Sequence, residues 1–119
     1  MNKTVLVVDD QIGIRLLLEE VIQQEGYNVE LALNGKEALD KIMNNKPDLI
    51  MLDYKLPIID GPTLVKNLEN DNIVIPTIMM SGLPEKAEDD VQNFKSISKT
   101  IGKPFQLNDI RELVKNILE

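Results

Sequence analysis

Short apolar runs alternate with amphipathic segments along the whole chain, and this alternation limits the possible folds more than any other feature. A strand is expected at each of five places: Thr4–Val8, Tyr27–Leu33, Leu49–Leu52, Val74–Met80 and Ile97–Gly102. After each run, apolar residues recur at helical spacing. Five strand–helix units in succession predict a doubly wound α/β fold, in which helices cover both faces of a parallel sheet. We therefore expect one domain over residues 1–119, with no second, output domain.

The expected helices carry their own start and stop signals. Asn34 is suited to cap the second helix, which runs through Ile42, and Pro62 fits the first turn of the third, which runs to about Asn70. Gly26 ends the first helix. Apolar stripes mark the first, fourth and fifth helices: Ile14, Leu17, Leu18, Val21 and Ile22; Ala87, Val91 and Phe94; Leu107, Ile110, Val114 and Ile117.

The chain contains neither His nor Cys, which excludes disulfides, thiol catalysis and imidazole or thiolate metal sites. A bound metal would therefore be a hard, oxygen-liganded cation such as magnesium, manganese or calcium. The net charge of -7 argues against a nucleic-acid partner. No apolar run approaches the ~20 residues of a membrane span, and no signal peptide is evident. We expect a cytoplasmic protein that meets protein partners and binds no membrane.

Polar side chains stand where the expected strands end. Asp9 and Asp10 follow the first strand, Asp53 follows the third, Ser81 the fourth, and Lys103 the fifth. In an open parallel sheet, ligands bind outside the carboxyl ends of the strands. The five side chains are therefore expected to converge on one cleft.

Three carboxylates in one cleft repel one another, by about 4 kcal/mol for each pair at ~4 Å and an effective dielectric constant near 20. A divalent cation relieves this repulsion, and magnesium combines one or two carboxylates with a phosphoryl oxygen. One Asp alone could simply cap the next helix. A tandem pair joined by Asp53 at an equivalent place favours a metal site.

The same cleft could carry out chemistry. Asp53 is either a metal ligand only or a nucleophile, because carboxylates form acyl-phosphate intermediates. Lys103 could neutralise charge during phosphoryl transfer, or be one of many surface lysines. Ser81 could donate a hydrogen bond to a phosphoryl oxygen, or serve only as a turn residue before Gly82.

The motifs VVDD, LDYKLPIIDG, IMMSG and KPF, in this order, resemble the receiver domain of two-component response regulators over the whole chain. The resemblance implies a (βα)5 flavodoxin-like fold with strand order 2-1-3-4-5. It also implies that Asp53 is the phosphoacceptor and that Asp10, Asp53 and the backbone carbonyl of Lys55 bind Mg2+ (or Mn2+). Asp9 would act nearby through water. Ser81 would take the family's Ser/Thr switch position, and Lys103 would contact the phosphoryl group.

The resemblance further implies a monomer that takes a phosphoryl group from a sensor histidine kinase and passes it to a histidine phosphotransferase. Such a protein is a phosphotransfer intermediate rather than a small-molecule enzyme. Family members usually carry an aromatic residue or His three positions before the conserved lysine, where this chain has Thr100. That departure favours a relay role over an output switch. The alternative is a receiver that signals by docking on a partner after phosphorylation.

Two other classes fit less well. A phosphatase of the haloacid dehalogenase class needs a second Asp two residues after its nucleophile, but Lys55 and Gln11 occupy those positions here. A flavin or nucleotide binder would cradle phosphate with its first loop. Asp9 and Asp10 would repel that anion.

The first expected helix carries extra apolar residues, Ile12 and Leu16, beside its core stripe. They border the cleft, so a partner helix bearing the phosphohistidine could dock there. A helix buried on a broad face is the alternative explanation. The expected docking residues are Gln11, Gly13, Ile14, Arg15 and Leu17.

Overall fold

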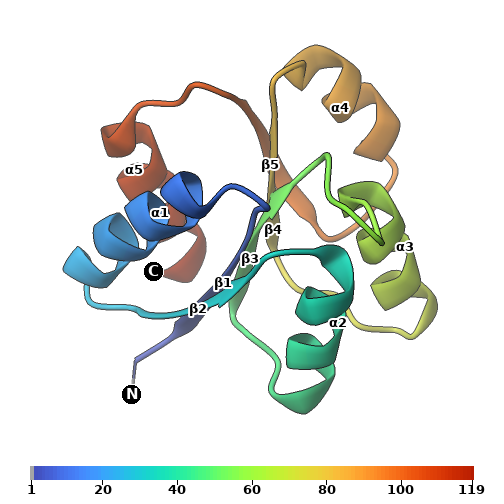
Figure 1. Ribbon diagram of the computed structural model, residues 1–119, viewed down its shortest axis with the longest axis horizontal. Helices are drawn as coiled ribbons and strands as arrows, with labels where there is room; N and C mark the ends of the chain where they lie inside the picture. Colours follow the sequence, from blue (N-terminus) through green and yellow to red (C-terminus); the bar gives the residue numbers. More distant parts are fainter. Residues whose placement is uncertain (1) are drawn as a thin grey trace.

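The computed structural model describes residues 2–119 and contains a five-stranded parallel sheet in the order β2-β1-β3-β4-β5 (Figure 1). The predicted α/β flavodoxin-like fold and strand order are confirmed. The strands are β1 Thr4–Val8, β2 Asn28–Ala32, β3 Leu49–Asp53, β4 Thr77–Ser81 and β5 Ile97–Gly102. The helices are α1 Ile12–Gln24, α2 Gly35–Asn44, α3 Gly61–Asn70, α4 Pro84–Val91 and α5 Leu107–Leu118.

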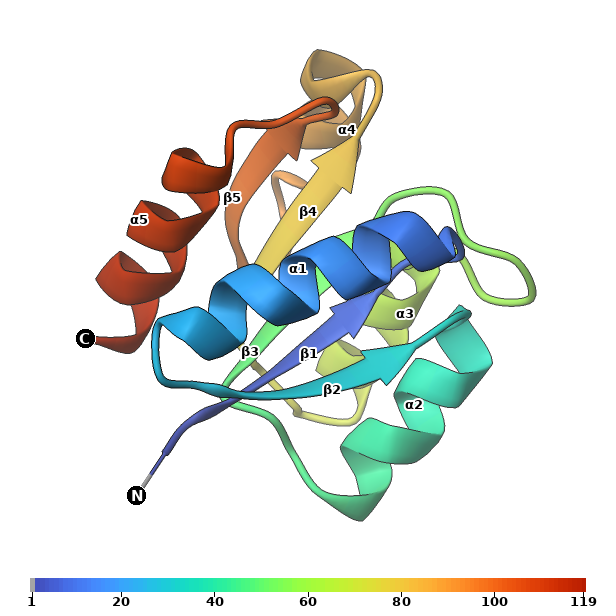
Figure 2. The same ribbon diagram turned by 60° about the vertical axis from the view of Figure 1, so that its left-hand side comes forward.

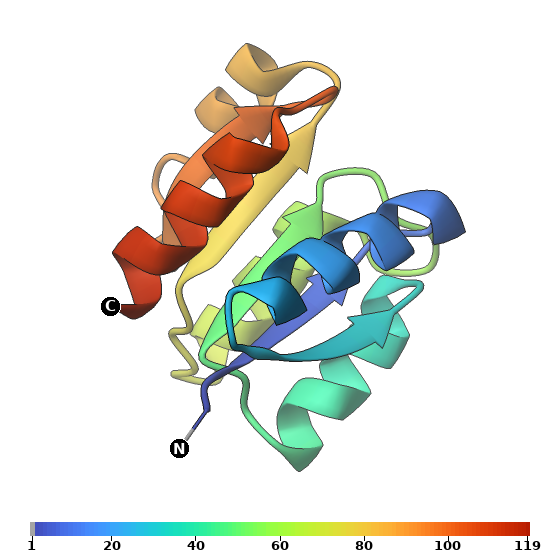
Figure 3. The ribbon, with the colours of Figure 1, turned by 90° about the vertical axis from the view of Figure 1, so that its left-hand side faces the viewer.

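The sheet separates two apolar cores. Leu6 and Val8 of β1 pack in the core covered by α2, α3 and α4, whereas Val5 and Val7 pack in the core under α1 and α5. Figures 2 and 3 show α1 and α5 on one face of the sheet and α2 and α3 on the other. Because both faces are covered, the central strands are continuous apolar runs rather than alternating ones.

Local signals in the sequence set the helix starts. The Asn34 side chain accepts a hydrogen bond from the Glu37 N–H at 2.8 Å, which confirms the predicted cap of α2. Pro62 lies in the first turn of α3 as expected, and Asp60 caps that helix by accepting from the Thr63 N–H. Each cap satisfies a backbone donor that would otherwise lack a partner.

Several expectations differ from the structure. β2 spans Asn28–Ala32 rather than Tyr27–Leu33, and β3 ends at Asp53 rather than Leu52. β4 begins at Thr77 rather than Val74, because Pro76 has no N–H to donate to a strand ladder. The helix α4 ends at Val91, and Phe94 follows it in a turn while still packing against the core. Leu17, expected in the core stripe of α1, is 37% exposed, so that stripe is narrower than its spacing suggests.

The Lys103–Pro104 peptide bond, just after β5, is cis. Within residues 2–119, none of the helices is both long enough and apolar enough to span a membrane.

Candidate functional site

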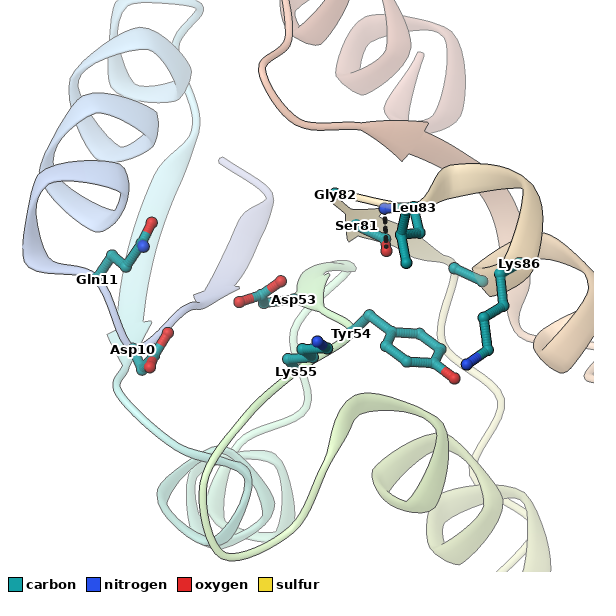
Figure 4. Close-up of a pocket in the computed structure, with 10 residues that line it drawn as sticks. Asp10, Gln11, Asp53, Tyr54, Lys55, Ser81, Gly82, Leu83 and Lys86 are labelled. Atoms are coloured by element: carbon teal, nitrogen blue, oxygen red, sulfur yellow. Dashed lines mark hydrogen bonds between the residues drawn. The ribbon is translucent and has the colours of Figure 1, made fainter.

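The polar residues predicted to converge do meet at the carboxyl edge of the sheet. Asp53 and Ser81 end β3 and β4, while Asp9 and Lys103 directly follow β1 and β5. In Figure 4 the Asp53 carboxylate lies between Asp10 on one side and Ser81 on the other. Neighbouring parallel strands bring residues distant in the sequence to one edge, which explains this convergence.

The tandem carboxylates occupy different environments. Asp9 is fully buried, and its carboxylate accepts from Lys103 Nζ at 2.6 Å and from the Gln11 N–H at 2.9 Å. Asp10 is exposed and lines the cavity in front of Asp53. Two adjacent carboxylates can therefore follow a buried strand, because Asp9 faces an internal lysine and Asp10 faces the cleft.

Lys103 bridges two of the carboxylates. Its Nζ lies 2.6 Å from an oxygen of Asp9 and 3.3 Å from Oδ1 of Asp53. The Lys103 N–H also donates to the Ser81 carbonyl at 2.8 Å, which ties the start of the β5–α5 loop to the end of β4. The ammonium group is thus held beside the Asp53 carboxylate, as charge neutralisation at that group requires.

Burial raises the pKa of the Asp53 carboxyl to about 6, and the negative charge of Asp9 adds to this rise. The charge of Lys103 and its hydrogen bond oppose the shift, and Asp10 contributes a smaller rise. One lysine therefore does not offset the burial and the two neighbouring carboxylates. The site carries excess negative charge that a further cation would relieve.

The donor set fits a hard metal ion. Each of Asp9, Asp10 and Asp53 offers a carboxylate oxygen, and these oxygens lie within 4.8 Å of one another. Oxygen-only ligands of this kind suit Mg2+ and other hard divalent cations. The cluster can therefore hold a divalent cation.

Two small residues shape the backbone around Asp53. A Cβ at Gly61 would lie 2.6 Å from the Asp53 carbonyl oxygen, so only glycine lets the start of α3 approach the end of β3 so closely. The Ser81 Oγ accepts from the Leu83 N–H at 3.0 Å, which turns the chain into α4. This hydroxyl still has its own hydrogen to donate.

A cavity of about 370 Å³ extends from Asp10 past Asp53 to α4. It includes residues to which the sequence analysis gave no role in the site: Tyr54, Leu83, Lys86 and Ala87. The Tyr54 hydroxyl donates to Asp90 of α4, and this hydrogen bond raises the pKa of Tyr54. The sequence signals for the presence of Tyr54 here were its position directly after Asp53 and its place in the motif LDYKLPIIDG.

The expected docking residues lie around the start of α1. Gln11 and Gly13 are exposed, Ile14 is half-buried against the core, and Leu17 is partly exposed. Arg15 donates from Nη1 to the Asp9 carbonyl at 2.7 Å, so it is anchored rather than free. The most exposed apolar side chains of this helix are those of Ile12, at 65%, and Leu16, at 52%.

Comparisons with known proteins agree with this geometry. Residues 5–115 match the family model described as "Response regulator receiver domain". The chain is 40% identical over 120 residues to sporulation initiation phosphotransferase F of Bacillus subtilis (strain 168), covering 99% of this chain and 95% of that protein. It is 36% identical over 118 residues to the alkaline phosphatase synthesis transcriptional regulatory protein PhoP of the same organism, covering 99% of this chain but 49% of that protein.

Solved structures give the same result. The receiver domain of the Francisella response regulator 1452 superposes with a TM-score of 0.89 at 30% identity, covering 98% of this chain and 96% of that one. The Vibrio cholerae chemotaxis protein CheY4 superposes with a TM-score of 0.88 at 29% identity, covering 99% of this chain and 100% of that one. The resemblance of the sequence motifs is confirmed, and the chain belongs to the response regulator receiver domains of two-component signal transduction.

Proposed function

We propose that Asp53 accepts a phosphoryl group from the phosphohistidine of a sensor histidine kinase and that the protein passes it to a histidine phosphotransferase. The observation that carries this proposal is the buried Asp53 carboxylate, with Lys103 Nζ at 3.3 Å and two further carboxylates beside it. Receiver domains interact with kinases and phosphotransferases of these kinds. The likeness to sporulation initiation phosphotransferase F supports a cytoplasmic phosphorelay, with control of sporulation as its proposed output.

The chemistry follows from the site. An oxygen of Asp53 attacks phosphorus, the P–N bond to the donor imidazole breaks, and the imidazole nitrogen keeps the electron pair. Lys103 neutralises negative charge on the phosphoryl oxygens, and the Ser81 hydroxyl donates its free hydrogen to one of them. Asp10, Asp53 and the Lys55 backbone carbonyl would hold Mg2+ or Mn2+, with Asp9 acting through water. When bound, the ion supplies further charge neutralisation.

Position 100 supports a relay rather than an output switch. Thr100 has no ring to move, and its Oγ1 is buried with no hydrogen-bond partner among residues 2–119. A switch by rotation of an aromatic side chain at this position is therefore absent from the proposed mechanism. We propose that the protein acts as a monomeric carrier, and signalling by phosphorylation-dependent docking is the second choice.

Incubation with acetyl phosphate and Mg2+ is expected to add one phosphoryl group to the protein, as measured by intact mass. Hydroxylamine should remove it, because acyl phosphates are labile to this nucleophile. Asp53→Asn should abolish the addition, whereas Asp40→Asn, at a side chain that is 67% exposed, should label normally. Full labelling of Asp53→Asn would exclude Asp53 as the acceptor, and full labelling in EDTA would exclude the metal requirement.

The exposed part of α1 is the proposed docking surface for the phosphohistidine partner. Replacing both Ile12 and Leu16 by Ala is expected to slow phosphorylation by a cognate kinase about tenfold while labelling by acetyl phosphate stays normal. Both side chains are exposed on the first part of α1, which follows Asp10 and Gln11 of the cavity, and aliphatic side chains of this kind are typical contacts of a partner helix. Val74→Ala, at another exposed side chain, is the matched control. Equal loss with both donors would show damage to the site instead.

A further inference from the structure

Lys86 is the single basic residue of α4, whose other charged side chains are all acidic: Glu85, Glu88, Asp89 and Asp90. It lies on the side of the helix that lines the cavity beside Asp53, as Figure 4 shows. Within residues 2–119, Lys86 belongs to none of the ion pairs, although Asp90 is one helical turn away. Its charge is therefore available to a molecule that enters the cavity.

The cavity has two unlike ends. Around Asp53 it is polar and holds the residues proposed to bind the phosphoryl group and the metal. Toward α4 its wall is made of the Tyr54 ring, Leu83 and Ala87, with Lys86 beyond them. The Tyr54–Asp90 hydrogen bond joins this wall to α4 and fixes the side of the cavity that Lys86 occupies.

The cavity is longer than a phosphoryl group needs. With a volume of about 370 Å³, it runs from Asp10 past Asp53 to Lys86 and Ala87 of α4. The remaining space has a short apolar wall and the ammonium group of Lys86. It therefore suits the leaving group of a phosphodonor that is small, partly apolar and negatively charged when it departs. A short acyl group on phosphate has both properties, because it departs as a carboxylate.

We propose that Lys86 is a specificity-determining residue that attracts the leaving group of small anionic phosphodonors, so that short acyl phosphates are used in preference to donors with a cationic leaving group. This inference rests on the proposed function of Asp53 as phosphoacceptor. In a chain of net charge -7, Lys86 and Lys55 are the two lysines that line this cavity, and Lys86 supplies the local attraction for an anion at the α4 end.

The two donor classes differ only beyond the phosphorus atom. With acetyl phosphate, an Asp53 oxygen bonds to phosphorus, the P–O bond to the acyl group breaks, and acetate leaves with the electron pair. With phosphoramidate, the same P–O bond to Asp53 forms, the P–N bond breaks, and the ammonium nitrogen leaves as ammonia. Lys86 favours the departing acetate and gives no advantage to the ammonium group.

The test compares labelling rates of the full chain with these two donors in Mg2+. Lys86→Gln is expected to lower the second-order rate with acetyl phosphate about three- to fivefold, the size expected for one partly solvated charge contact, and to leave the phosphoramidate rate within about twofold. Lys86→Arg should restore most of the acetyl phosphate rate. High salt should shrink the difference between Lys86→Gln and the parent. Lys66→Gln, an exposed lysine of α3 that does not line the cavity, makes the same change in net charge and should alter neither rate.

The outcomes separate the two proposals. If neither donor labels the parent at Asp53, the proposed acceptor function fails, and this inference fails with it. If the parent is labelled but Lys86→Gln slows both donors equally, or neither, Lys86 does not select the leaving group. An equal effect of Lys66→Gln on acetyl phosphate would assign the preference to overall charge rather than to the cavity.

Discussion

Asp53→Asn is expected to be more stable than the parent protein by about 3 kcal/mol at about pH 8 in metal-free buffer. The folded protein holds the pKa of Asp53 at about 6, against an ordinary value of 3.8. A difference of about two pKa units, at about 1.4 kcal/mol per unit, gives this figure. Asparagine matches the shape of the neutral acid without its charge.

The pH dependence of this gain has a definite sign. Between about pH 4 and 6 the folded state binds more protons at Asp53 than the unfolded state, so the contribution of Asp53 to stability falls as the pH rises. The advantage of Asp53→Asn should therefore be largest above pH 6. It should shrink to less than about 1 kcal/mol near pH 4, where the parent carboxyl is protonated in the folded protein.

Urea unfolding at several pH values measures this effect, with EDTA present throughout. Asp40→Asn, at an exposed carboxylate, should show almost no change at any pH. A ligand that binds the folded state raises its stability, and Asp53 is a proposed Mg2+ ligand. Added Mg2+ should therefore stabilise the parent more than Asp53→Asn. Equal stability of the parent and Asp53→Asn at about pH 8 would contradict a strained acidic site, as would a gain that grows toward low pH.

The fold was predictable because its signals are local. β1 and β5 have the bounds that their apolar runs predict. The expected start of β4 was wrong because one residue, Pro76, interrupts the apolar run that predicted the strand. Convergence of the polar residues followed from the parallel topology, which needs no knowledge of side-chain contacts.

The resemblance to receiver domains implied different roles for Asp9 and Asp10, but the strand pattern alone does not say which of these adjacent identical residues is buried. Which of the two is buried depends on Lys103, which lies 94 positions from Asp9 in the chain and meets it only in the folded protein. A sequence pattern predicts to which face of the sheet a side chain points, but not which residue it contacts there.

The placement of Lys86 was also beyond the sequence, because it depends on how α4 packs. A Cβ at Gly102 would lie 3.2 Å from the Pro84 side chain, a tight contact, so the approach of β5 to the start of α4 favours a small residue in another element. Helical spacing places Lys86 one turn from Asp90 but does not say which face of α4 borders Asp53.

Lys103→Met is expected to destabilise the metal-free protein by about 3 kcal/mol, the cost typical of removing one partner from a buried ion pair. Asp9 is fully buried, and without the ammonium group its charge would keep, among residues 2–119, only the Gln11 N–H as a close donor. Lys103 also lowers the pKa of Asp53, so its loss leaves two neighbouring carboxylates without a counter-charge. The methionine side chain fills similar space, which limits the effect to charge.

The origin of this loss can be isolated with a second substitution. Asp9→Asn combined with Lys103→Met removes both buried charges and should recover most of the lost stability, because replacing both partners of a buried pair is often nearly neutral. Lys99→Met, at an exposed lysine of β5, should change stability by less than about 0.5 kcal/mol. Denaturant midpoints of the parent, Lys103→Met, the double variant and Lys99→Met, all measured in EDTA, give the comparison. If Asp9→Asn fails to rescue Lys103→Met, the lysine stabilises the fold through packing of its aliphatic chain, and Asp9 does not depend on it for charge balance.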